Sequence, residues 1–211
     1  NGQGVKQDFQ QALLWYQKAA NQGNVKAQWN LGSIYASGRD GIRPDLRQAA
    51  IWCRKAAEAG FVPAQSTLAA IYARSKGEGH LEQAIFWWSK AAEQGDLEAQ
   101  YNLGLMYSQG QGAPQDFARA FALFSKAAEQ GLPSAQSRLG LMYATAQGVP
   151  LDYIEAYKWF MLAEDKGDNA ARENLEHSAT LMSPQQIAEG QRRAMEWAST
   201  NPKKPGAKKG G

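Results

Sequence analysis

The sequence contains few residues of the kinds that build disulfides, metal centres or membrane spans. Its 211 residues include one cysteine, Cys53, and two histidines, His80 and His177. One cysteine cannot form an internal disulfide. The histidines stand about a hundred residues apart without metal-spaced ligands beside them, which argues against a zinc site. No apolar run approaches the roughly 20 residues of a transmembrane helix. This composition therefore favours none of these three classes.

The folded part of the chain also lacks an excess of positive charge. The net charge of +3 depends on four lysines in residues 201–211, and the rest of the chain has 19 basic and 20 acidic residues. A nucleic-acid-binding protein should carry a basic stripe on its folded surface, and none is visible, so we expect no nucleic-acid partner. The Pro/Gly/Lys composition of residues 201–211 predicts a disordered tail, which we interpret as solubilising.

An internal repeat with a period of about 36 residues dominates the sequence. The pattern Ala-x₃-Leu-(Gly or Ala)-x₂-Tyr begins at Ala27, Ala64, Ala99 and Ala135, and a degraded copy begins at Ala171. Successive copies are 37, 35, 36 and 36 residues apart. A near-constant period of this length is typical of solenoids, in which each repeat packs against its neighbours. Such proteins usually hold partners on an extended surface.

A second pattern, Ala-x₂-Trp-aromatic-x₂-Ala-x₃-Gly, alternates with the first, with Cys53 and Leu123 as exceptions. Offsets of 3, 4 and 7 place its residues on one helix face, and the closing glycine fits a left-handed C-terminal cap. Each repeat is therefore predicted to contain a helix A, a loop, a helix B and a glycine turn. We interpret Cys53 as a buried apolar side chain rather than a nucleophile. The predicted helices A cover residues 27–37, 64–74, 99–109, 135–145 and 170–181, and the predicted helices B cover 9–22, 46–59, 81–94, 117–130 and 153–166.

An aspartate precedes the first alanine of helix B by four residues in four repeats, at Asp8, Asp45, Asp116 and Asp152. Aspartate there can accept hydrogen bonds from the first helical turn as an N-cap. The third repeat has His80 instead, which predicts a defective cap that His80→Asp would improve by about 0.5–1 kcal/mol. The aspartates would repel a phosphate from the neighbouring Gly-x-Gly loops, which also lack the lysine of a phosphate cradle. We expect no enzymatic activity, no cofactor and no metal.

Two segments resemble the consensus of the Sel1-like repeat, a relative of the tetratricopeptide repeat with a glycine-rich loop between its helices. They are residues 99–107 (AQYNLGLMY) and residues 87–95 (WWSKAAEQG). The resemblance covers roughly residues 2–182. It implies an all-α fold, an α-solenoid in which helix-turn-helix repeats form a right-handed superhelix. The single cysteine separates the chain from the cysteine-rich branch of this family, so penicillin binding is not carried over.

The chain is predicted to comprise three segments. Residues 1–182 form the Sel1-like solenoid, with a partial first repeat, four full repeats and the start of a last one. Residues 183–200 form a C-terminal capping helix, since Ser183, Pro184 and Gln186 fit a capping box. Its predicted apolar stripe is Ile187, Gln191, Ala194, Met195 and Ala198, with Arg192 and Arg193 on the other side. Residues 201–211 are the basic tail.

Residue 1 falls inside a repeat, just ahead of a helix B. We therefore expect further sequence before it in the full-length protein, and we expect Trp15 and Tyr16 to lack a neighbour. The alternative is that the first helix is itself an N-terminal cap. A targeting segment ahead of residue 1 would fit a periplasmic or exported protein, and a cytoplasmic location stays open.

The family resemblance implies that helix A lines the concave surface, so function is expected at its variable positions. With Ala, Leu and Tyr facing the core, offsets of about 2, 3, 6 and 10 from the repeat alanine should face the groove. Trp29 and Tyr101 resemble the aromatic anchors of protein interfaces, or they fold down onto the adjacent helix. The predicted partner-binding residues are Trp29, Asn30, Ser33, Arg74, Tyr101, Asn102, Leu105, Arg138, Leu141 and Arg172.

The predicted function is that of a non-catalytic scaffold or adaptor that binds a partner protein or peptide in its concave groove. Relatives of this kind act in regulation, in host interaction and as inhibitors of toxic effectors. The alternative is a receptor for a small ligand, a glycan or a peptidoglycan fragment that uses the groove aromatics.

Overall fold

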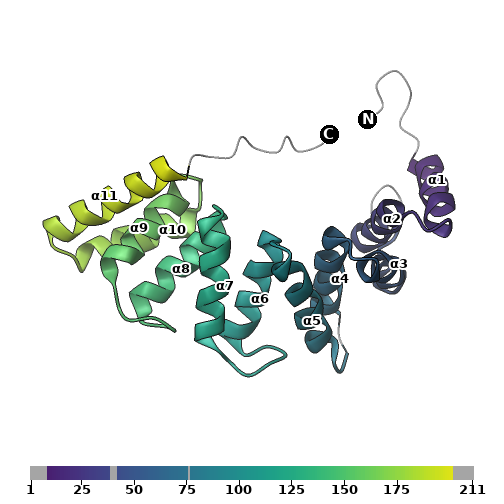
Figure 1. Cartoon of the computed structure of the whole chain (residues 1–211), viewed down its shortest axis with the longest axis horizontal. Helices are drawn as coiled ribbons and strands as arrows, with labels where there is room; N and C mark the ends of the chain where they lie inside the picture. The colour runs from purple at the N-terminus through teal and green to yellow at the C-terminus, as the bar shows by residue number, and fades with distance from the viewer. Residues whose placement is uncertain (1–8, 39–41, 76, 202–211) are drawn as a thin grey trace, which may run out of the picture. The chain divides into compact units, whose positions relative to one another are not determined.

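The computed structural model describes residues 9–38, 42–75 and 77–201, which form eleven α-helices and no β-strand. The odd-numbered helices α1 to α9 are the helices B of the sequence pattern, and α2 to α10 are the helices A. This confirms the all-α class of tandem helix pairs. The helices are α1 (Phe9–Asn21), α2 (Val25–Ser37), α3 (Leu46–Glu58), α4 (Val62–Arg74), α5 (His80–Glu93), α6 (Leu97–Gln109), α7 (Phe117–Glu129), α8 (Pro133–Thr145), α9 (Tyr153–Glu164), α10 (Asn169–Thr180) and α11 (Pro184–Thr200) (Figure 1).

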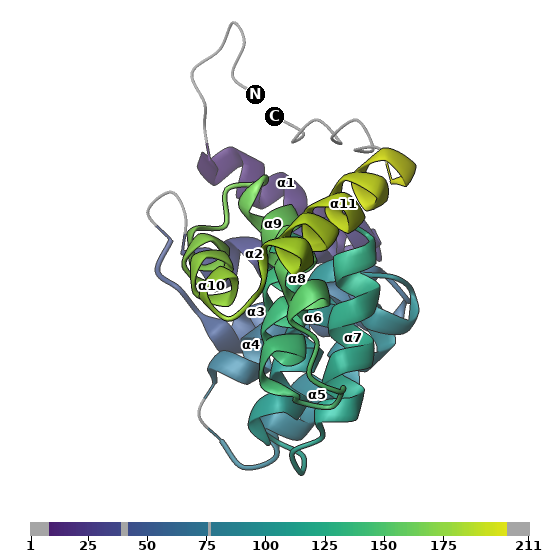
Figure 2. The same cartoon turned by 90° about the vertical axis from the view of Figure 1, so that its left-hand side faces the viewer.

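The chain forms two compact units, residues 1–99 and residues 100–211, whose boundary falls in the first turn of α6. In the first unit α2 packs against α1, α3 and α4, and α4 packs against α3 and α5. In the second unit α8 packs against α7, α9 and α10, and α9 also packs against α11 (Figure 2). The helices A at α2, α4 and α8 each lie between two helices B, which buries the apolar stripes of both.

The helices A begin two residues earlier than predicted in the four full repeats. The residue three positions before the repeat alanine is the N-cap: Asn24, Asp96 and Asp168 accept a hydrogen bond from the N–H of Ala27, Ala99 and Ala171 at 2.9, 2.8 and 3.1 Å. Phe61 and Leu132 hold the same position without a side-chain acceptor, and a proline follows in the first turn. Because the residue type at this position varies, the sequence pattern did not reveal it.

The aspartates before the helices B are N-caps, as predicted for Asp45, Asp116 and Asp152. Asp152 accepts hydrogen bonds from the N–H groups of Ile154 and Glu155 at 2.9 and 3.0 Å. The backbone N–H of each cap residue also donates to the carbonyl of the repeat tyrosine in the preceding helix A, namely Tyr35, Tyr107 and Tyr143, at 2.8, 2.9 and 3.1 Å. Each aspartate therefore closes the A–B loop from both sides. Asp8 lies outside the described residues.

The assignment of His80 to the cap position is wrong. The N-cap of α5 is Gly79, which has the left-handed φ of 71°, and His80 is the first residue of the helix. The imidazole is half-buried and meets the ring of Tyr72 edge-on at a centroid distance of 5.5 Å. Its Nδ1 atom is buried without a hydrogen-bond partner among the described residues. His80 is thus a packing residue, one position inside the helix.

The helix pairs approach closely because the residue after the repeat leucine is small. A Cβ atom on Gly104 of α6 would lie 2.7 Å from Phe124 Cε1 of α7, and one on Gly32 of α2 would clash with Cys53 Sγ of α3. Phe124 and Cys53 are almost completely buried. Burial raises the pKa of the Cys53 thiol to about 12, which agrees with its interpretation as an apolar side chain. The glycines that close the helices B, Gly23, Gly60, Gly95, Gly131 and Gly167, have φ between 83° and 90°, as predicted.

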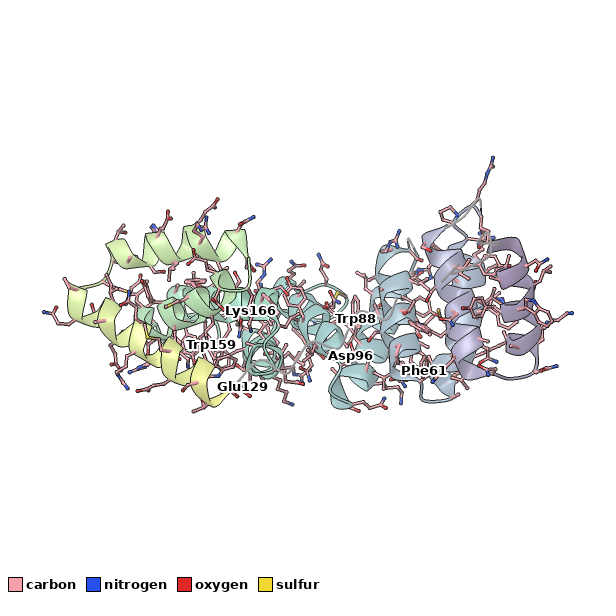
Figure 3. All side chains as sticks on the ribbon, turned by 90° about the horizontal axis from the view of Figure 1, so that it is seen from above. Phe61, Trp88, Asp96, Glu129, Trp159 and Lys166 are labelled. Carbon is pink, nitrogen blue, oxygen red and sulfur yellow. The ribbon has the colours of Figure 1, made fainter. Side chains whose placement is uncertain are left out.

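A buried glutamine follows the repeat alanine and was missed by the sequence patterns. Gln28, Gln65 and Gln136 each donate from Nε2 to a carbonyl near the end of the preceding helix B, those of Ala20, Ala57 and Ala128, at 3.1–3.3 Å. The carbonyl oxygen of Gln65 accepts from Gln94 at 2.8 Å, and that of Gln136 accepts from Lys166 at 3.3 Å. Lys166 (labelled in Figure 3) also donates to the Gly131 carbonyl at 2.9 Å. These polar contacts fix each helix A on the helices B around it.

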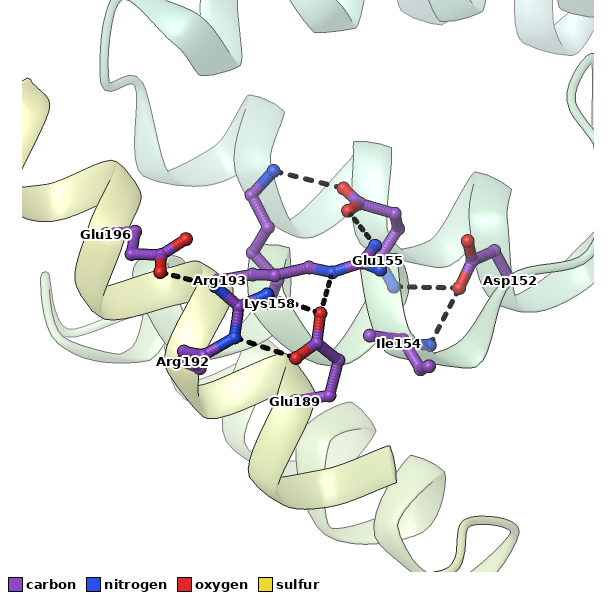
Figure 4. A network of polar contacts seen from close by, with 8 residues as sticks. All are labelled: Asp152, Ile154, Glu155, Lys158, Glu189, Arg192, Arg193 and Glu196. Atoms are coloured by element: carbon purple, nitrogen blue, oxygen red, sulfur yellow. Dashed lines mark hydrogen bonds and ion pairs between the residues drawn. The ribbon is translucent and has the colours of Figure 1, made fainter. Parts of the chain in front are cut away.

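The helix α11 packs against α9 and begins with the predicted capping box of Ser183 and Gln186. Its predicted stripe is only partly right, because Met195 and Ala198 are exposed while Gly190 and Ala194 are buried. Trp197 supplies the main aromatic contact, 5.7 Å from Trp159 between ring centroids. Arg193 does not point away from the core. It bonds Glu155 of α9 at 2.7 Å and Glu189 of its own helix at 2.8 Å (Figure 4).

Candidate interaction surface

The ten residues predicted to bind a partner differ in how much surface they offer. Arg74, Arg138 and Arg172 are exposed, and the other seven are half-buried. Asn30, Asn102 and the Tyr101 hydroxyl make no hydrogen bond with any described residue. These ten residues are called the helix-A face. Each compact unit carries its own part of this face.

Trp29 folds onto the next helix A instead of standing free. Its Nε1–H donates to Thr67 Oγ1 at 3.0 Å, and its ring meets Phe61 edge-on at 5.6 Å. Phe61 is the N-cap of α4, and Thr67 lies in its second turn. This favours the packing interpretation of Trp29, although the side chain is only half-buried.

Two other residues that stand two positions after a repeat alanine, Ser66 and Tyr101, also contact a neighbouring element. Ser66 donates a hydrogen bond to Asp96, the N-cap residue of the following helix A, at 2.8 Å. Phe61 and Asp96 are labelled in Figure 3. Tyr101 packs on Phe124 at 5.7 Å and joins the cluster that contains Leu132. Offset 2 is therefore a contact between successive repeats, and the sequence period could not show how far these side chains reach.

Leu105 and Leu141 contribute to the interior more than to the surface. Leu105 packs against the cluster of Ala120, Phe124 and Met142, and Leu141 packs against the cluster around Phe160. Their offset from the repeat alanine predicted that both leucines face the groove. In the structure, both pack against buried clusters of neighbouring helices instead. Their exposed edges leave room for only a limited contact with a partner.

The arginines separate into paired and unpaired groups. Arg172 forms an ion pair with Glu164 at 2.9 Å. Arg74 and Arg138 have no ion-pair partner among the described residues. In the second unit, Asn102 and Arg138 occupy the same repeat position of α6 and α8, and Tyr101 precedes Asn102 on α6. This trio offers a phenol, an amide and a guanidinium with open hydrogen-bonding capacity.

The chemistry of the described residues offers no metal-binding group, since no three His, Cys, Asp or Glu side chains gather in them. Burial, followed by the carboxylates of Glu155, Asp152 and Glu129, raises the pKa of Tyr143. The carboxylates disfavour its phenolate, so Tyr143 stays a neutral packing residue. The candidate surface is therefore suited to recognition by hydrogen bonds and contact area.

A pocket between α1 and α2 was not predicted as a site. It has a volume of about 620 Å³ and is lined by Ala12, Trp15, Tyr16 and Ala19 of α1 and by Ala27 and Asn30 of α2, among others. Trp15 is 67 % exposed and Tyr16 is 37 % exposed, which agrees with the expectation that they lack a neighbour. The repeat pattern contained the signal for this pocket, because it showed both aromatics at positions that other repeats bury.

Comparison with known proteins gives a consistent result. The sequence profile of the Sel1 repeat matches five consecutive segments, residues 1–24, 25–61, 62–96, 97–132 and 133–168. A protective antigen of uropathogenic Escherichia coli strains that displays an SLR fold is 35% identical, with a TM-score of 0.88 over 93% of this chain. The chain spans 42% of the length of that antigen.

Two further solved structures are similar. A Sel1 repeat protein from Oxalobacter formigenes is 33% identical, with a TM-score of 0.76 over 92% of this chain and 81% of its own. A Sel1 repeat protein from Klebsiella pneumoniae is 25% identical, with a TM-score of 0.51 over 82% of this chain and 86% of its own. Comparison with curated proteins gives no match. Within the described part of the chain, no helix has the length and apolar character to cross a bilayer.

Proposed function

Because the chain belongs to the Sel1 repeat family, whose members are generally protein-interaction scaffolds, we propose that it is a non-catalytic scaffold that binds a partner protein or peptide on its helix-A face. The fold supports this function through rigid, repeated helix pairs, each of which presents a few variable side chains. The buried glutamines and the closed A–B loops hold these side chains in place before a partner arrives, which reduces the entropy lost on binding.

The observation that carries the proposal is the open trio of the second unit. Tyr101, Asn102 and Arg138 lie on two successive helices A and have no polar partner among the described residues. Tyrosine and arginine are enriched among the residues that dominate interface energies. The unpaired guanidinium of Arg138 matches a carboxylate with two parallel hydrogen bonds. The partner surface is therefore expected to present an acidic side chain or a chain terminus to α8.

In the first unit, we propose that Asn30, Ser33 and Arg74 form a separate part of the partner-binding face. Arg74 is exposed and unpaired among the described residues, so it repeats the chemistry of Arg138 at another offset. Trp29 has a supporting role, because its indole N–H is already bonded to Thr67. Arg172 would need to leave Glu164 before it could bind a partner.

The experiment is affinity capture from the native cell with the wild-type chain and matched variants, followed by quantitative mass spectrometry. Tyr101→Ala and Arg138→Ala should each weaken a specific complex by about 2 kcal/mol, or roughly 30-fold, if they are anchors. Circular dichroism checks that the helix content is unchanged. Deleting residues 203–211 should have little effect at physiological salt, where exposed charges are screened beyond about 8 Å.

Two outcomes would contradict the proposal. In one, deletion of the tail abolishes binding while both helix-A-face variants bind normally. In the other, no protein is captured and a sugar or peptidoglycan fragment is retained instead, which would favour the receptor alternative. Trp29→Phe keeps the ring on Phe61 but removes the indole N–H, so it separates a packing role from direct contact.

A further inference from the structure

The helix α11 shows how a second helix docks on the side of a helix B. It packs against α9 so closely that a Cβ atom added to Gly190 would lie 2.9 Å from the Tyr157 ring. Arg193 of α11 pairs with Glu155 of α9 at 2.7 Å (Figure 4). Close helix packing and charge pairing therefore act together at this interface.

Four residues of α9 lie in this interface or at its edge. The side chain of Leu162 is 7 % exposed and shares a buried cluster with Ala194 of α11, and the side chain of Lys158 is 15 % exposed. In α3 the residues at the same distances from the repeat alanine are all exposed, and Ile51 keeps 49 % of its surface. The four residues of α9 are Ile154, Glu155, Lys158 and Leu162, and their equivalents in α3, here called the α3 face, are Arg47, Gln48, Ile51 and Lys55.

The α3 face is basic around an apolar centre. Arg47, Ile51 and Lys55 follow one another at intervals of four residues, which places them on one side of the helix. Lys55 Nζ lies 4.3 Å from the centre of the Trp52 ring, and neither Arg47 nor Lys55 forms an ion pair with a described residue. The one acidic residue of α3 is Glu58, the last residue of the helix. Two unpaired cations beside an exposed isoleucine match an acidic amphipathic segment and disfavour a basic one.

The equivalent face of α5 has the same apolar exposure but a different charge. Phe86, the equivalent of Ile51, is 48 % exposed, and Lys90 Nζ lies 5.0 Å from the centre of its ring. Glu82, however, takes the position of Arg47. The α5 positions thus carry one charge of each sign, whereas the α3 face carries two positive charges and no negative one. An acidic partner is therefore attracted to α3 rather than to α5.

We propose that the α3 face binds an acidic amphipathic helix of a partner protein in the way that α11 binds α9. A small residue lets the partner helix approach closely, an apolar side chain covers Ile51, and carboxylates pair with Arg47 and Lys55. The polarity is the reverse of the α9 interface, where α11 supplies the guanidinium and α9 the carboxylate. The site goes beyond the helix-A face, because its residues belong to a helix B and give the scaffold a second docking surface.

The test uses two synthetic peptides with the sequence of residues 184–200. One is unchanged, and the other carries Arg192→Glu and Arg193→Glu, which makes it acidic while it keeps Gly190. Each peptide is titrated into the chain labelled at its isoleucine methyl groups, and the Ile51 resonance is followed by NMR after its assignment with Ile51→Val. We expect the acidic peptide to give a saturable shift with a dissociation constant of the order of 0.1–1 mM, because a short peptide is only partly helical before it binds. The unchanged peptide should bind at least about tenfold more weakly.

Matched protein variants locate the site. Lys55→Glu should lose at least about tenfold in affinity for the acidic peptide, while Phe86→Ala, at the equivalent position of α5, should bind as the wild type does. Circular dichroism and the urea midpoint check that both variants are folded.

Four outcomes would overturn the proposal. The Ile51 resonance does not shift at about 2 mM acidic peptide, the two peptides bind equally, or Phe86→Ala weakens binding as much as Lys55→Glu does. In the fourth outcome, vesicles that contain phosphatidylglycerol perturb the Ile51 resonance and the acidic peptide does not, which would assign the α3 face to a membrane surface.

Discussion

At the scale of single residues, His80 shows how the same sequence position can serve two purposes. At α3, α7 and α9 the equivalent aspartate caps helix B, but in α5 the cap moves one residue back to Gly79. The imidazole then packs on Tyr72 at 5.5 Å. A carboxylate at position 80 would lie inside the first turn and would lose this contact.

We therefore predict that His80→Asp does not raise the urea midpoint and lowers it slightly, because the loss of an aromatic contact offsets any gain from the helix dipole. His80→Phe should be at least as stable as the wild type, since it keeps the ring contact and removes the unpaired Nδ1 atom. Asp152→Ala provides the comparison with a functioning cap and should cost about 1 kcal/mol. A clear stabilisation by His80→Asp would restore the defective-cap hypothesis.

A second residue-scale prediction concerns Gln136, which is fully buried. Its amide donates to the Ala128 carbonyl and accepts from Lys166. Gln136→Ala removes the amide donor of the buried Ala128 carbonyl and one of the acceptors of Lys166, so the free energy of unfolding should fall by about 1–3 kcal/mol. Ser134→Ala, two residues earlier on the same helix and only half-buried, is a control for helix propensity. Equal denaturant midpoints of the two variants would show that the buried hydrogen bonds contribute little.

At the scale of elements, α11 is attached to α9 by both an aromatic pair and an ion-pair network. Glu189 accepts from Arg192 and Arg193, and Arg193 bridges to Glu155 of α9 (Figure 4). Hydrogen bonds from Arg192 and then Arg193 lower the pKa of Glu189 to about 2. The carboxylate therefore stays ionised in the folded protein at pH values where it is partly protonated in the unfolded chain.

The sign of this shift predicts an acid-sensitive attachment of α11. A lowered folded-state pKa adds stability that is present above the ordinary value of 4.5 and is lost as pH falls toward 2. The urea midpoint of the wild type should therefore fall more between pH 5 and pH 2 than that of Glu189→Gln. Glu176→Gln, an exposed carboxylate of α10 without an ion pair among the described residues, should behave as the wild type. Identical pH slopes for all three proteins would contradict the prediction.

The elements also show what the sequence could and could not predict. The starts of the predicted helices B at α3, α7 and α9 matched because an aspartate cap marks them, and the closing glycine limits their ends. The helices A began two residues earlier than predicted because Asn24, Phe61 and Leu132 share a position but no side-chain chemistry. The candidate face was harder to predict, since helical periodicity gives the direction of Trp29 but not its reach to Thr67.

At the scale of the whole molecule, the reactivity of the single cysteine measures the opening of only one of the two units. Cys53 belongs to the unit of residues 1–99, is fully buried, and has a pKa raised to about 12 by burial. A thiol reagent at neutral pH should therefore react only after this part of the chain opens. We predict that labelling of the native protein is at least about 100-fold slower than in urea, which corresponds to an opening free energy of about 2.8 kcal/mol.

Variants then test whether the two units open separately. Asp45→Ala, which removes the cap of α3, should speed the labelling of Cys53. Glu189→Gln, in the unit of residues 100–211, should leave it unchanged. If both variants accelerate labelling equally, the chain unfolds as one cooperative unit, contrary to the nearest-neighbour behaviour expected of repeats.

The close contact of Gly32 with Cys53, and of Gly104 with Phe124, has a consequence for how such chains can evolve. The small residue of helix A and the ring or thiol of helix B share one fixed volume, so neither can change size alone without a clash or a void. Over evolutionary time the two positions should therefore drift as a couple, with enlargement of one accompanied by reduction of the other. Different repeats can therefore carry different pairs of residues at these two positions. Because the two members of a pair lie on different helices, a repeat can be duplicated or moved within an array only if both of its helices move together.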